Sequence, residues 1–496
     1  MPDGVAGCPR IGFITDVEGN LDFFQRAVNA SKIVQFTQGT TCFELEFKRK
    51  DYEDVFVFGG DYCDKGDGDI RIARSLVEFK KQQPYRVHLL LGNRDLNKIR
   101  VSAELRQSSI DVPDPVPLYP GMRESQTTTY RSYLLRLQQQ QGAATLDEMN
   151  TLPNRLRWLL DITLGAEGQF ESRREELRAL QMDSSDDGVV QSYIDAVESE
   201  DGHAWQYLWH GEALFRWGDT LFAHSGVPAG SPGWIPPLAL PYATPDDGNA
   251  CPGEYLPAGH TLDEWIAALN QRCRESMLEY RSDPSFMEGK RRRGELLLSM
   301  QSQPSSYKRS VVVLSPLVMG MPQEVPEEVT QYLLQRGVRR VVAGHKPCGD
   351  SPFVVHANGL ELIMSDTTYS DHTALDKRGR ALASVEVAYD GQSSCAILHG
   401  SLRDGVSYCF RLPPQGPKSA KLWTYMGDVL EDPYVGQKCA DGWWVKAVLS
   451  REDGCHYHCA FAEEGDRHVR YKRIPKTELE AAFAASAAAT QLGKAY

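Results

Sequence analysis

The sequence predicts a mixed α/β protein, and two observations lead to this fold class. First, short apolar runs that stop at a polar residue recur at 11–16, 55–61, 86–93, 219–226 and 340–345. Second, plausible helices lie between the first three of these runs, at 20–31 and 69–83. Alternating strands and helices are typical of a sheet with parallel strands and covering helices. Ligands bind beyond the carboxyl ends of such strands, where these polar residues fall.

A long segment between the third and fourth runs, residues 100–215, is predicted to be a helical insertion beside that edge of the sheet. Apolar residues recur in it at helical spacing, at 130–141, 153–164 and 168–182. Arg173 and Arg174 could belong to a substrate-binding patch, but they lie in a stretch of alternating charge, a pattern that favours an exposed helix. Two further helices are predicted after the insertion, at 261–282 and 324–337.

The C-terminal part has a different pattern, from which a second, smaller unit is predicted. Strands and turns at 361–412 complete the main domain, which spans 1–412. Residues 413–421 are rich in proline and polar residues and indicate a linker. Alternation of aromatic, β-branched and polar residues over 422–476 predicts a small β-barrel-like module. The alanine-rich segment 477–496 predicts a helical tail.

Composition restricts the class of partner. The 496 residues carry a formal net charge of -13, which argues against a nucleic-acid-binding protein. Apolar runs stay well below the roughly 20 residues that span a bilayer, and no signal peptide is apparent, so we expect a cytoplasmic protein without membrane contact. The 11 cysteines are scattered and odd in number, which favours reduced thiols.

The motifs at the five strand ends carry the functional argument. They are D-V-E-G-N (16–20), G-D-Y-C-D-K-G (60–66), G-N-R-D (92–95), H-S-G (224–226) and G-H-K-P (344–347). Each alone is weak evidence, because short matches arise by chance. In this order they resemble the calcineurin-like metallophosphoesterases, in particular the branch of serine/threonine protein phosphatases and symmetrical diadenosine tetraphosphatases. The resemblance covers roughly residues 1–400 apart from the insertion.

The resemblance implies a four-layer α/β/β/α sandwich and a site with two divalent metal ions. Asp16, Glu18 and Asp61 would hold the first ion. Asp61 would bridge to the second, which Asn93, His224 and His345 would complete. Two ions neutralise the charge of a phosphate ester, hold it and lower the pKa of bound water. Taken singly, each aspartate is also a common helix N-cap and each histidine a common core residue.

Two residues depart from the family pattern. Glu18 replaces a histidine, and its oxygen ligand favours manganese or magnesium over zinc, with iron as a further alternative. The opposing interpretation is that the first ion is lost and only the second binds. Arg94 replaces the histidine that, in the resemblance, pairs with Asp64 and protonates the leaving group. Arginine stays charged and cannot act as that acid, although it can stabilise negative charge while Asp64 orients it.

These departures shape the expected function. We expect a metal-dependent phosphoesterase that prefers nucleotides or other phosphoanhydrides to alkyl phosphates such as phosphoserine. Lys65, Arg94 and Lys346 are the expected phosphate-binding residues. His203 and His210 are alternative acids, although each is more often a packed or surface residue.

Two rival functions remain open. One is a protein serine/threonine phosphatase with a peptide-binding C-terminal module and a phosphoprotein substrate. The other is a pseudophosphatase that binds phosphate or acts as a scaffold without turnover.

Overall fold

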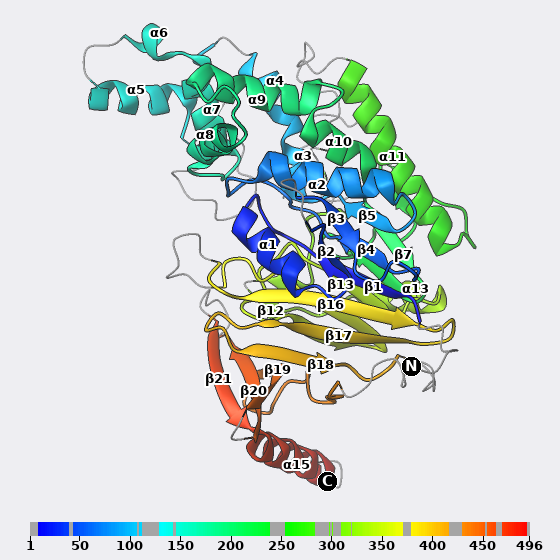
Figure 1. The fold of residues 1–496 in the computed structure, drawn as a ribbon. Coiled ribbons are helices and arrows are strands. Elements are labelled where there is room, and N and C mark those ends of the chain that lie inside the picture. Colours follow the sequence, from blue (N-terminus) through cyan, green and yellow to red (C-terminus); the bar gives the residue numbers. More distant parts are fainter. Residues whose placement is uncertain are drawn as a thin grey trace.

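The architecture comes from a computed structural model of the chain (Figure 1). It describes residues 8–38, 43–106, 109–111, 128–141, 145–238, 253–282, 297, 300, 309–318, 320–370, 378–415, 429–451, 454–462 and 469–493. Most of the expected linker, 413–421, lies outside these residues.

The first of two central sheets has seven strands in the order β18-β17-β16-β1-β4-β5-β6. Their bounds are β1 (Arg10–Ile14), β4 (Val55–Phe58), β5 (Val87–Leu90), β6 (Gly211–Glu212), β16 (Leu382–Tyr389), β17 (Ser394–Ser401) and β18 (Ser407–Arg411). β1, β4, β5 and β6 run parallel, with Ile14 opposite Phe58 at the carboxyl end of the central pair. β16 joins β1 antiparallel and begins the C-terminal half of the sheet.

The second sheet has the order β14-β15-β13-β8-β7. Its strands are β7 (Leu214–Trp217), β8 (Thr220–Ala223), β13 (Arg340–Ala343), β14 (Phe353–Ala357) and β15 (Leu360–Met364). β13 lies between β8 and β15 and runs parallel to both. The strands predicted to end at His224 and His345 are therefore neighbours in one sheet.

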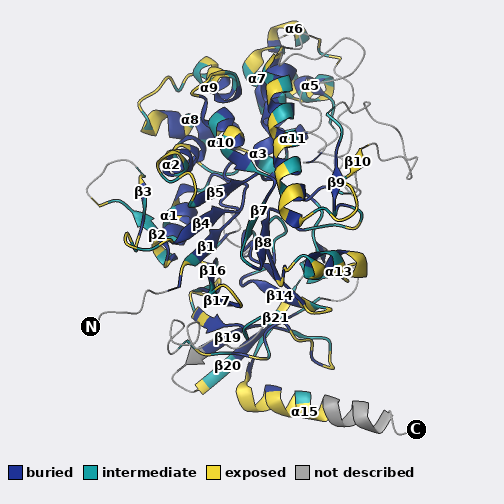
Figure 2. Cartoon of the chain, turned by 90° about the vertical axis from the view of Figure 1, so that its right-hand side faces the viewer, coloured by how far each residue is buried: buried dark blue, intermediate teal, exposed yellow. Residues whose placement is uncertain are grey.

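The two sheets face each other and helices cover their outer faces, which confirms the predicted α/β/β/α sandwich. Phe13 of the first sheet and Phe222 of the second meet in the core between them. Helices α1 (Leu21–Ala30) and α2 (Asp69–Gln82) cover the first sheet. Helices α11 (Leu262–Ser282) and α13 (Glu327–Gln335) cover the second. Figure 2 shows the strands buried between helices whose outer surfaces are exposed.

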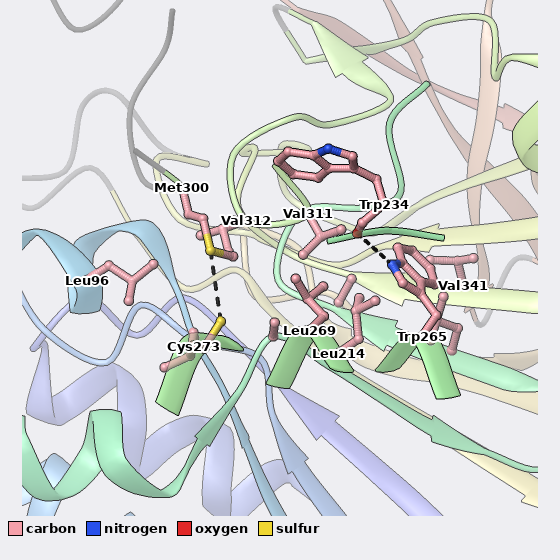
Figure 3. Packing of buried hydrophobic residues seen from close by; sticks show 14 of the residues in the cluster. Leu96, Leu214, Trp234, Trp265, Leu269, Cys273, Met300, Val311, Val312 and Val341 are labelled. Carbon is pink, nitrogen blue, oxygen red and sulfur yellow. Dashed lines mark hydrogen bonds between the residues drawn. The ribbon is translucent and has the colours of Figure 1, made fainter. Parts of the chain in front are cut away.

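The contact between α11 and the second sheet shows how one covering helix is held. Trp265 of α11 is fully buried, and its indole N–H donates to the carbonyl oxygen of Trp234 at 3.1 Å. Leu269 on the same helix face packs with Leu214 and Val341 of the sheet (Figure 3). Trp265 and Leu269 are four residues apart, which places them on the one face of α11 that meets the sheet.

The predicted insertion, residues 100–215, is mainly helical in its described parts up to His210, and its last residues belong to β6 and β7. Its helices are α4 (Ile99–Leu105), α5 (Tyr130–Gln141), α6 (Leu146–Met149), α7 (Leu152–Trp158), a π-helix (Leu159–Thr163), α8 (Gln169–Ala179), α9 (Asp186–Glu198) and α10 (His203–His210). Apart from α10, these helices contribute to one apolar cluster that contains Tyr130, Leu156 and Trp158, together with Ile70 of α2. Together with α3 (Asn93–Asn97), they cover the edge of the sheets where the first three motifs lie (Figure 1).

The C-terminal strands β19 (Trp444–Arg451), β20 (Gly454–Phe461) and β21 (Arg470–Pro475) form a three-stranded antiparallel sheet, followed by α15 (Lys476–Gly493). In its described residues this sheet is not a closed barrel. Its apolar side chains, such as Val445 and Tyr457, belong to the same core as Phe13. The C-terminal segment therefore packs as a continuation of the sandwich.

The remaining elements are short pairs of strands at the periphery: β2 (Val34–Phe36) with β3 (Leu45–Phe47), β9 (Trp234–Ile235) with β10 (Glu254–Tyr255), and β11 (Leu317–Val318) with β12 (Met321–Pro322). Among the described residues, none of the helices is both long and apolar enough to cross a lipid bilayer.

Candidate metal centre

The polar residues at the strand ends do meet at one edge of the sheets. His345, after β13, places its Nδ1 2.8 Å from Oδ1 of Asn93, the first residue of α3. His224, after β8, places its Nε2 3.3 Å from the same oxygen and 3.5 Å from Oδ1 of Asp61. Asp61, His224 and His345 can each direct a ligand atom within 4.8 Å of the others. The predicted second-ion ligands therefore lie together.

The loops that hold these residues adopt backbone conformations that non-glycine residues rarely take. Asp16, Asp61 and His345 have φ values of 53°, 56° and 68°. Such conformations cost free energy and are retained where the surrounding structure holds them, often at functional sites. The loops also approach closely: a Cβ on Gly92 would lie 2.2 Å from Oδ1 of Asp61, and one on Gly344 would lie 2.1 Å from Oδ2 of Asp16. Only glycine fits at these two positions.

Both histidines are oriented as metal ligands usually are. Nδ1 of His224 lies 2.7 Å from the carbonyl oxygen of Gly59, and Nε2 of His345 lies 3.0 Å from that of Val313. If each of these nitrogens donates its proton to the carbonyl, the other nitrogen presents a lone pair towards Asn93. Burial lowers the pKa of both rings, which favours this neutral form. The four ligands thus fit one divalent ion.

Asp95 fixes the relative position of two of the ligand loops, a role that the motif alone did not reveal. Its buried carboxylate accepts hydrogen bonds from the backbone N–H groups of Asp61 (2.9 Å), Tyr62 (2.9 Å) and Gly92 (2.8 Å). Two strand ends are therefore tied together by one side chain. The signal in the sequence was the acid that closes G-N-R-D.

Glu18 does not have the surroundings expected of a metal ligand. Its Oε1 lies 2.6 Å from Nε of Arg94. Its Oε2 lies 2.9 Å from Nη2 of Arg378 and accepts a hydrogen bond of 2.9 Å from the hydroxyl of Tyr369. Although burial acts in the opposite direction, Arg94, Lys65 and Arg378 lower the pKa of Glu18. The structure thus places this carboxylate among cationic side chains.

Asp16 is buried beside these residues and contacts other groups of the centre. Its carboxylate accepts hydrogen bonds from the Thr15 hydroxyl and, at 3.1 Å, from the backbone N–H of His345. Burial, together with the neighbouring carboxylates of Asp366 and Asp61, raises the pKa of Asp16 well above its usual range. Asp16 therefore supports the turn that presents His345.

Arg94 makes the contact with Asp64 that the sequence predicted. Its Nη1 donates to Oδ2 of Asp64 at 2.6 Å, and its backbone N–H donates to Oδ1 of Asp61 at 2.8 Å. The second oxygen of Asp64 lies 2.6 Å from Nζ of Lys98, a buried residue that the motifs did not single out. Although burial opposes it, Glu18 and Asp64 raise the pKa of Arg94, so the guanidinium stays charged.

The two lysines expected to bind phosphate lie at the same centre. Lys65 contacts the Tyr369 hydroxyl, and burial lowers the pKa of its ammonium to about 8. Burial also lowers the pKa of Lys346, which the charges of Asp366 and Asp61 partly offset. Tyr369 and Arg378 were missed because they lie more than 350 positions from Glu18 in the sequence, beyond any local pattern.

The alternative acids are placed less favourably. His203 is buried at the start of α10, and burial lowers its pKa well below 6.5. His210 ends the same helix, and burial lowers its pKa as well. In the described part of the chain, neither forms a hydrogen bond or an ion pair with the metal-centre residues. Both therefore correspond to the packed-residue interpretation.

Comparison with known proteins identifies the N-terminal part of the chain. Residues 9–168 match the sequence model of the calcineurin-like phosphoesterase family, a stretch that contains the first three motifs. The expectation of a metal-dependent phosphatase is thereby confirmed at the level of this family. No curated protein matches the chain.

Solved structures with similarity to the chain include two phosphatases. One is a cold-active protein-tyrosine phosphatase of the psychrophile Shewanella sp., with 14% identity, 82% of each chain covered and a TM-score of 0.38. Another is a protein serine/threonine phosphatase from Saccharomyces cerevisiae with similarity to human phosphatase PP5. It has 10% identity, 79% of this chain and 73% of that chain covered, and a TM-score of 0.31.

Proposed function

Residues 9–168 carry the domain of the calcineurin-like phosphoesterases, and from this premise we propose that the chain hydrolyses a phosphomonoester or phosphoanhydride with the help of a divalent metal. The observation that carries the proposal is the convergence of Asp61, Asn93, His224 and His345 at the carboxyl ends of four strands. A bound divalent ion at these ligands would neutralise phosphate charge and lower the pKa of water.

The reaction is a substitution at phosphorus. Water adds to phosphorus, the bond to the leaving oxygen breaks, and the products are phosphate and either an alcohol or a shorter phosphate. Lys65, Arg94 and Lys346 supply positive charge around the phosphate oxygens. Their cluster beside the ligands supports a substrate that carries several negative charges, such as a nucleotide.

The leaving group is expected to decide which substrates react. Arg94 stands where the family has a histidine, and a guanidinium cannot donate a proton at neutral pH. His203 and His210 are unfavourable replacements, because in the described part of the chain neither forms a hydrogen bond or ion pair with the metal-centre residues and burial lowers the pKa of both. A phosphoanhydride releases a stable phosphate anion that needs little protonation, whereas an alkoxide needs it. We therefore expect dinucleoside polyphosphates or nucleotides to react faster than phosphoserine peptides.

Metal identity and number are finer expectations. Manganese is the first choice, with iron, zinc and magnesium as alternatives, and the family resemblance predicts two ions. The four clustered ligands fit one ion. A second ion beside Asp16 and Glu18 would have to compete with Arg94 and Arg378 for the Glu18 carboxylate.

The experiment is an assay of the purified chain, loaded with Mn²⁺, on p-nitrophenyl phosphate, a dinucleoside polyphosphate and a phosphoserine peptide. His224→Ala is the matched inactive variant, and His356→Ala, an exposed histidine on β14, is the control. Turnover of the first two substrates, lost only in His224→Ala, supports the proposal. Metal binding without turnover of any substrate would favour the pseudophosphatase. Equal rates on the peptide and the polyphosphate would contradict the leaving-group argument.

A rival protein-phosphatase function needs a different test from simple truncation. Removing the C-terminal sheet would expose Val445 and Tyr457, which share a core with the catalytic sheets. Loss of activity in such a truncation would report unfolding and not substrate choice. Substitution of the exposed Lys476 and Glu480 on α15 tests whether the C-terminal part affects the choice of protein substrate without exposing the core.

A further inference from the structure

Resting on the proposed function, we propose that this chain binds a single metal ion, and that the guanidinium of Arg94 takes the place of the other ion as the second positive group at the phosphate. The ion belongs to the set Asp61, Asn93, His224 and His345. Glu18, the ligand expected for the other ion, serves to hold Arg94. The proposal assigns Arg94 to substrate binding and Glu18 to positioning.

The first step of the argument is geometric. A metal ion that bridged Glu18 and Asp61 would lie about 2.0–2.2 Å from an oxygen of each. In the structure, Nε of Arg94 lies 2.6 Å from Oε1 of Glu18 and 3.6 Å from Oδ2 of Asp61. The guanidinium therefore stands between the two carboxylates that would share the ion.

The second step concerns charge. Arg378 lies 2.9 Å from the other oxygen of Glu18, so this carboxylate has a guanidinium on each side. A divalent ion at Glu18 would be within a few ångströms of both, and like charges at such distances repel strongly in a buried site. Binding of this ion would displace the Arg94 guanidinium and so would also break its ion pair with Asp64, in which Nη1 of Arg94 lies 2.6 Å from Oδ2 of Asp64.

The third step is accessibility. The side chain of Arg94 is 18% exposed, whereas those of Glu18, Arg378 and Asp64 are 4%, 1% and 0% exposed. Of these four side chains, Arg94 is therefore the most accessible to solvent, and the other three are buried around it. Arginine presents five N–H donors in a planar fork that matches phosphate oxygens. Held on two sides by carboxylates, the fork is already oriented before substrate arrives.

Asp16 then has a supporting role. Its carboxylate receives the Thr15 hydroxyl and the backbone N–H of His345. These contacts stabilise the strained turn at His345, which has a φ of 68°. Asp16→Asn retains an oxygen that can accept these hydrogen bonds, so it should leave the single ion in place.

The first test counts ions. The chain is loaded with Mn²⁺, freed of excess metal and measured by elemental analysis and by electron paramagnetic resonance, which distinguishes an isolated ion from a coupled pair. We expect about one ion per chain and the spectrum of an isolated Mn²⁺. Asp16→Asn should keep the ion, and His224→Ala should lose it. A spectrum of two coupled Mn²⁺ ions, or loss of metal in Asp16→Asn, would overturn the single-ion proposal but not the proposed function. A wild type without metal would overturn the proposed function.

The second test measures binding of inorganic phosphate to the metal-loaded chain by calorimetry. Arg94→Gln should weaken phosphate binding by about tenfold to a hundredfold while the metal content stays unchanged. Arg100→Gln, which breaks an ion pair with Glu104 on α4, is the matched control and should have little effect. Glu18→Gln provides a second variant in case Arg94→Gln does not fold. Unchanged phosphate affinity in the folded variants would contradict the proposal.

Discussion

The guanidinium of Arg173 lies 2.9 Å from the carboxylate of Asp69, and both side chains are buried. Arg173 comes from α8 of the helical insertion, whereas Asp69 begins α2 of the sandwich. The other oxygen of Asp69 accepts the backbone N–H of Asp64 at 3.1 Å, and Asp64 holds Arg94. The insertion is thereby linked to the metal centre through two carboxylates. The prediction that alternating charge exposes Arg173 was wrong for this residue.

Replacing Arg173 by methionine should destabilise the chain by about 3–5 kcal/mol, because the buried Asp69 carboxylate loses its cation. Thermal or urea unfolding measures this change. Arg178→Met, an exposed substitution on the same helix, is the control and should have little effect. If Arg173 also positions the loop at Asp64, the folded variant should show weaker phosphate binding. Equal stability of the two variants would contradict the role of the ion pair.

Glu176, next to Arg173 on α8, predicts a dependence of stability on pH. Burial raises the pKa of Glu176 to about 7, from 4.5, against the opposing effect of Arg173. The folded state therefore binds this proton more tightly than the unfolded chain. The resulting stability is fully present below about pH 4.5 and is lost as the pH rises through about 7, with an upper bound of about 3 kcal/mol.

Comparison of wild type with Glu176→Gln isolates the contribution of Glu176 to the pH dependence of stability, since the amide does not titrate. The difference in unfolding midpoint, wild type minus variant, should fall between pH 5 and pH 8. Glu175→Gln, an exposed neighbour, should leave the pH dependence of the wild type unchanged. A difference that stays constant over this range would exclude the raised pKa.

Asp95 should matter for metal binding although it is not a ligand. Its carboxylate accepts the N–H groups of Asp61, Tyr62 and Gly92, and an asparagine would turn an amide donor towards at least one of them. We expect Asp95→Asn to lower Mn²⁺ affinity by about 10–100-fold, as for other groups that orient ligands. Calorimetric titration of the apo chain measures this, with the exposed Asp51→Asn as control. An affinity equal to that of the control would show that the loops hold their positions without Asp95.

The second sheet contains a buried ion pair that should behave differently in single and double variants. Nε of Arg340 on β13 lies 2.5 Å from Oε1 of Glu361 on β15, and both side chains are 0% exposed. Glu361→Leu alone should cost about 3–5 kcal/mol, because it leaves Arg340 buried without its partner. The double variant Arg340→Met with Glu361→Leu should recover much of this loss. Additive losses in the double variant would indicate that packing, and not charge, dominates here.

Local patterns in the sequence predicted the strands, the helices and the edge of the sheet that carries the site, whereas the order of the layers and the ligand set followed from the family resemblance. An apolar run that ends at a polar residue predicts a buried strand and the edge of the sheet at which its last side chain emerges. The resemblance of the five motifs to a known family then implied that Asp61, Asn93, His224 and His345 act together as ligands. The helices of the insertion followed in the same way from apolar spacing. The C-terminal strands were also predicted, but not that their apolar faces would join the main core.

Which side chain neutralises which was decided only by the tertiary structure. Glu18 and Arg378 are separated by 360 positions, yet Nη2 of Arg378 lies 2.9 Å from Oε2 of Glu18. The residues adjacent in sequence to either one give no sign of this contact. The sequence by itself determined the strand ends and the motifs that resemble a metal-binding family, because both are local patterns. Ion pairing depends on distance and burial in three dimensions. Only the folded structure therefore shows that Glu18 pairs with Arg94 and Arg378 and that Arg173 is buried.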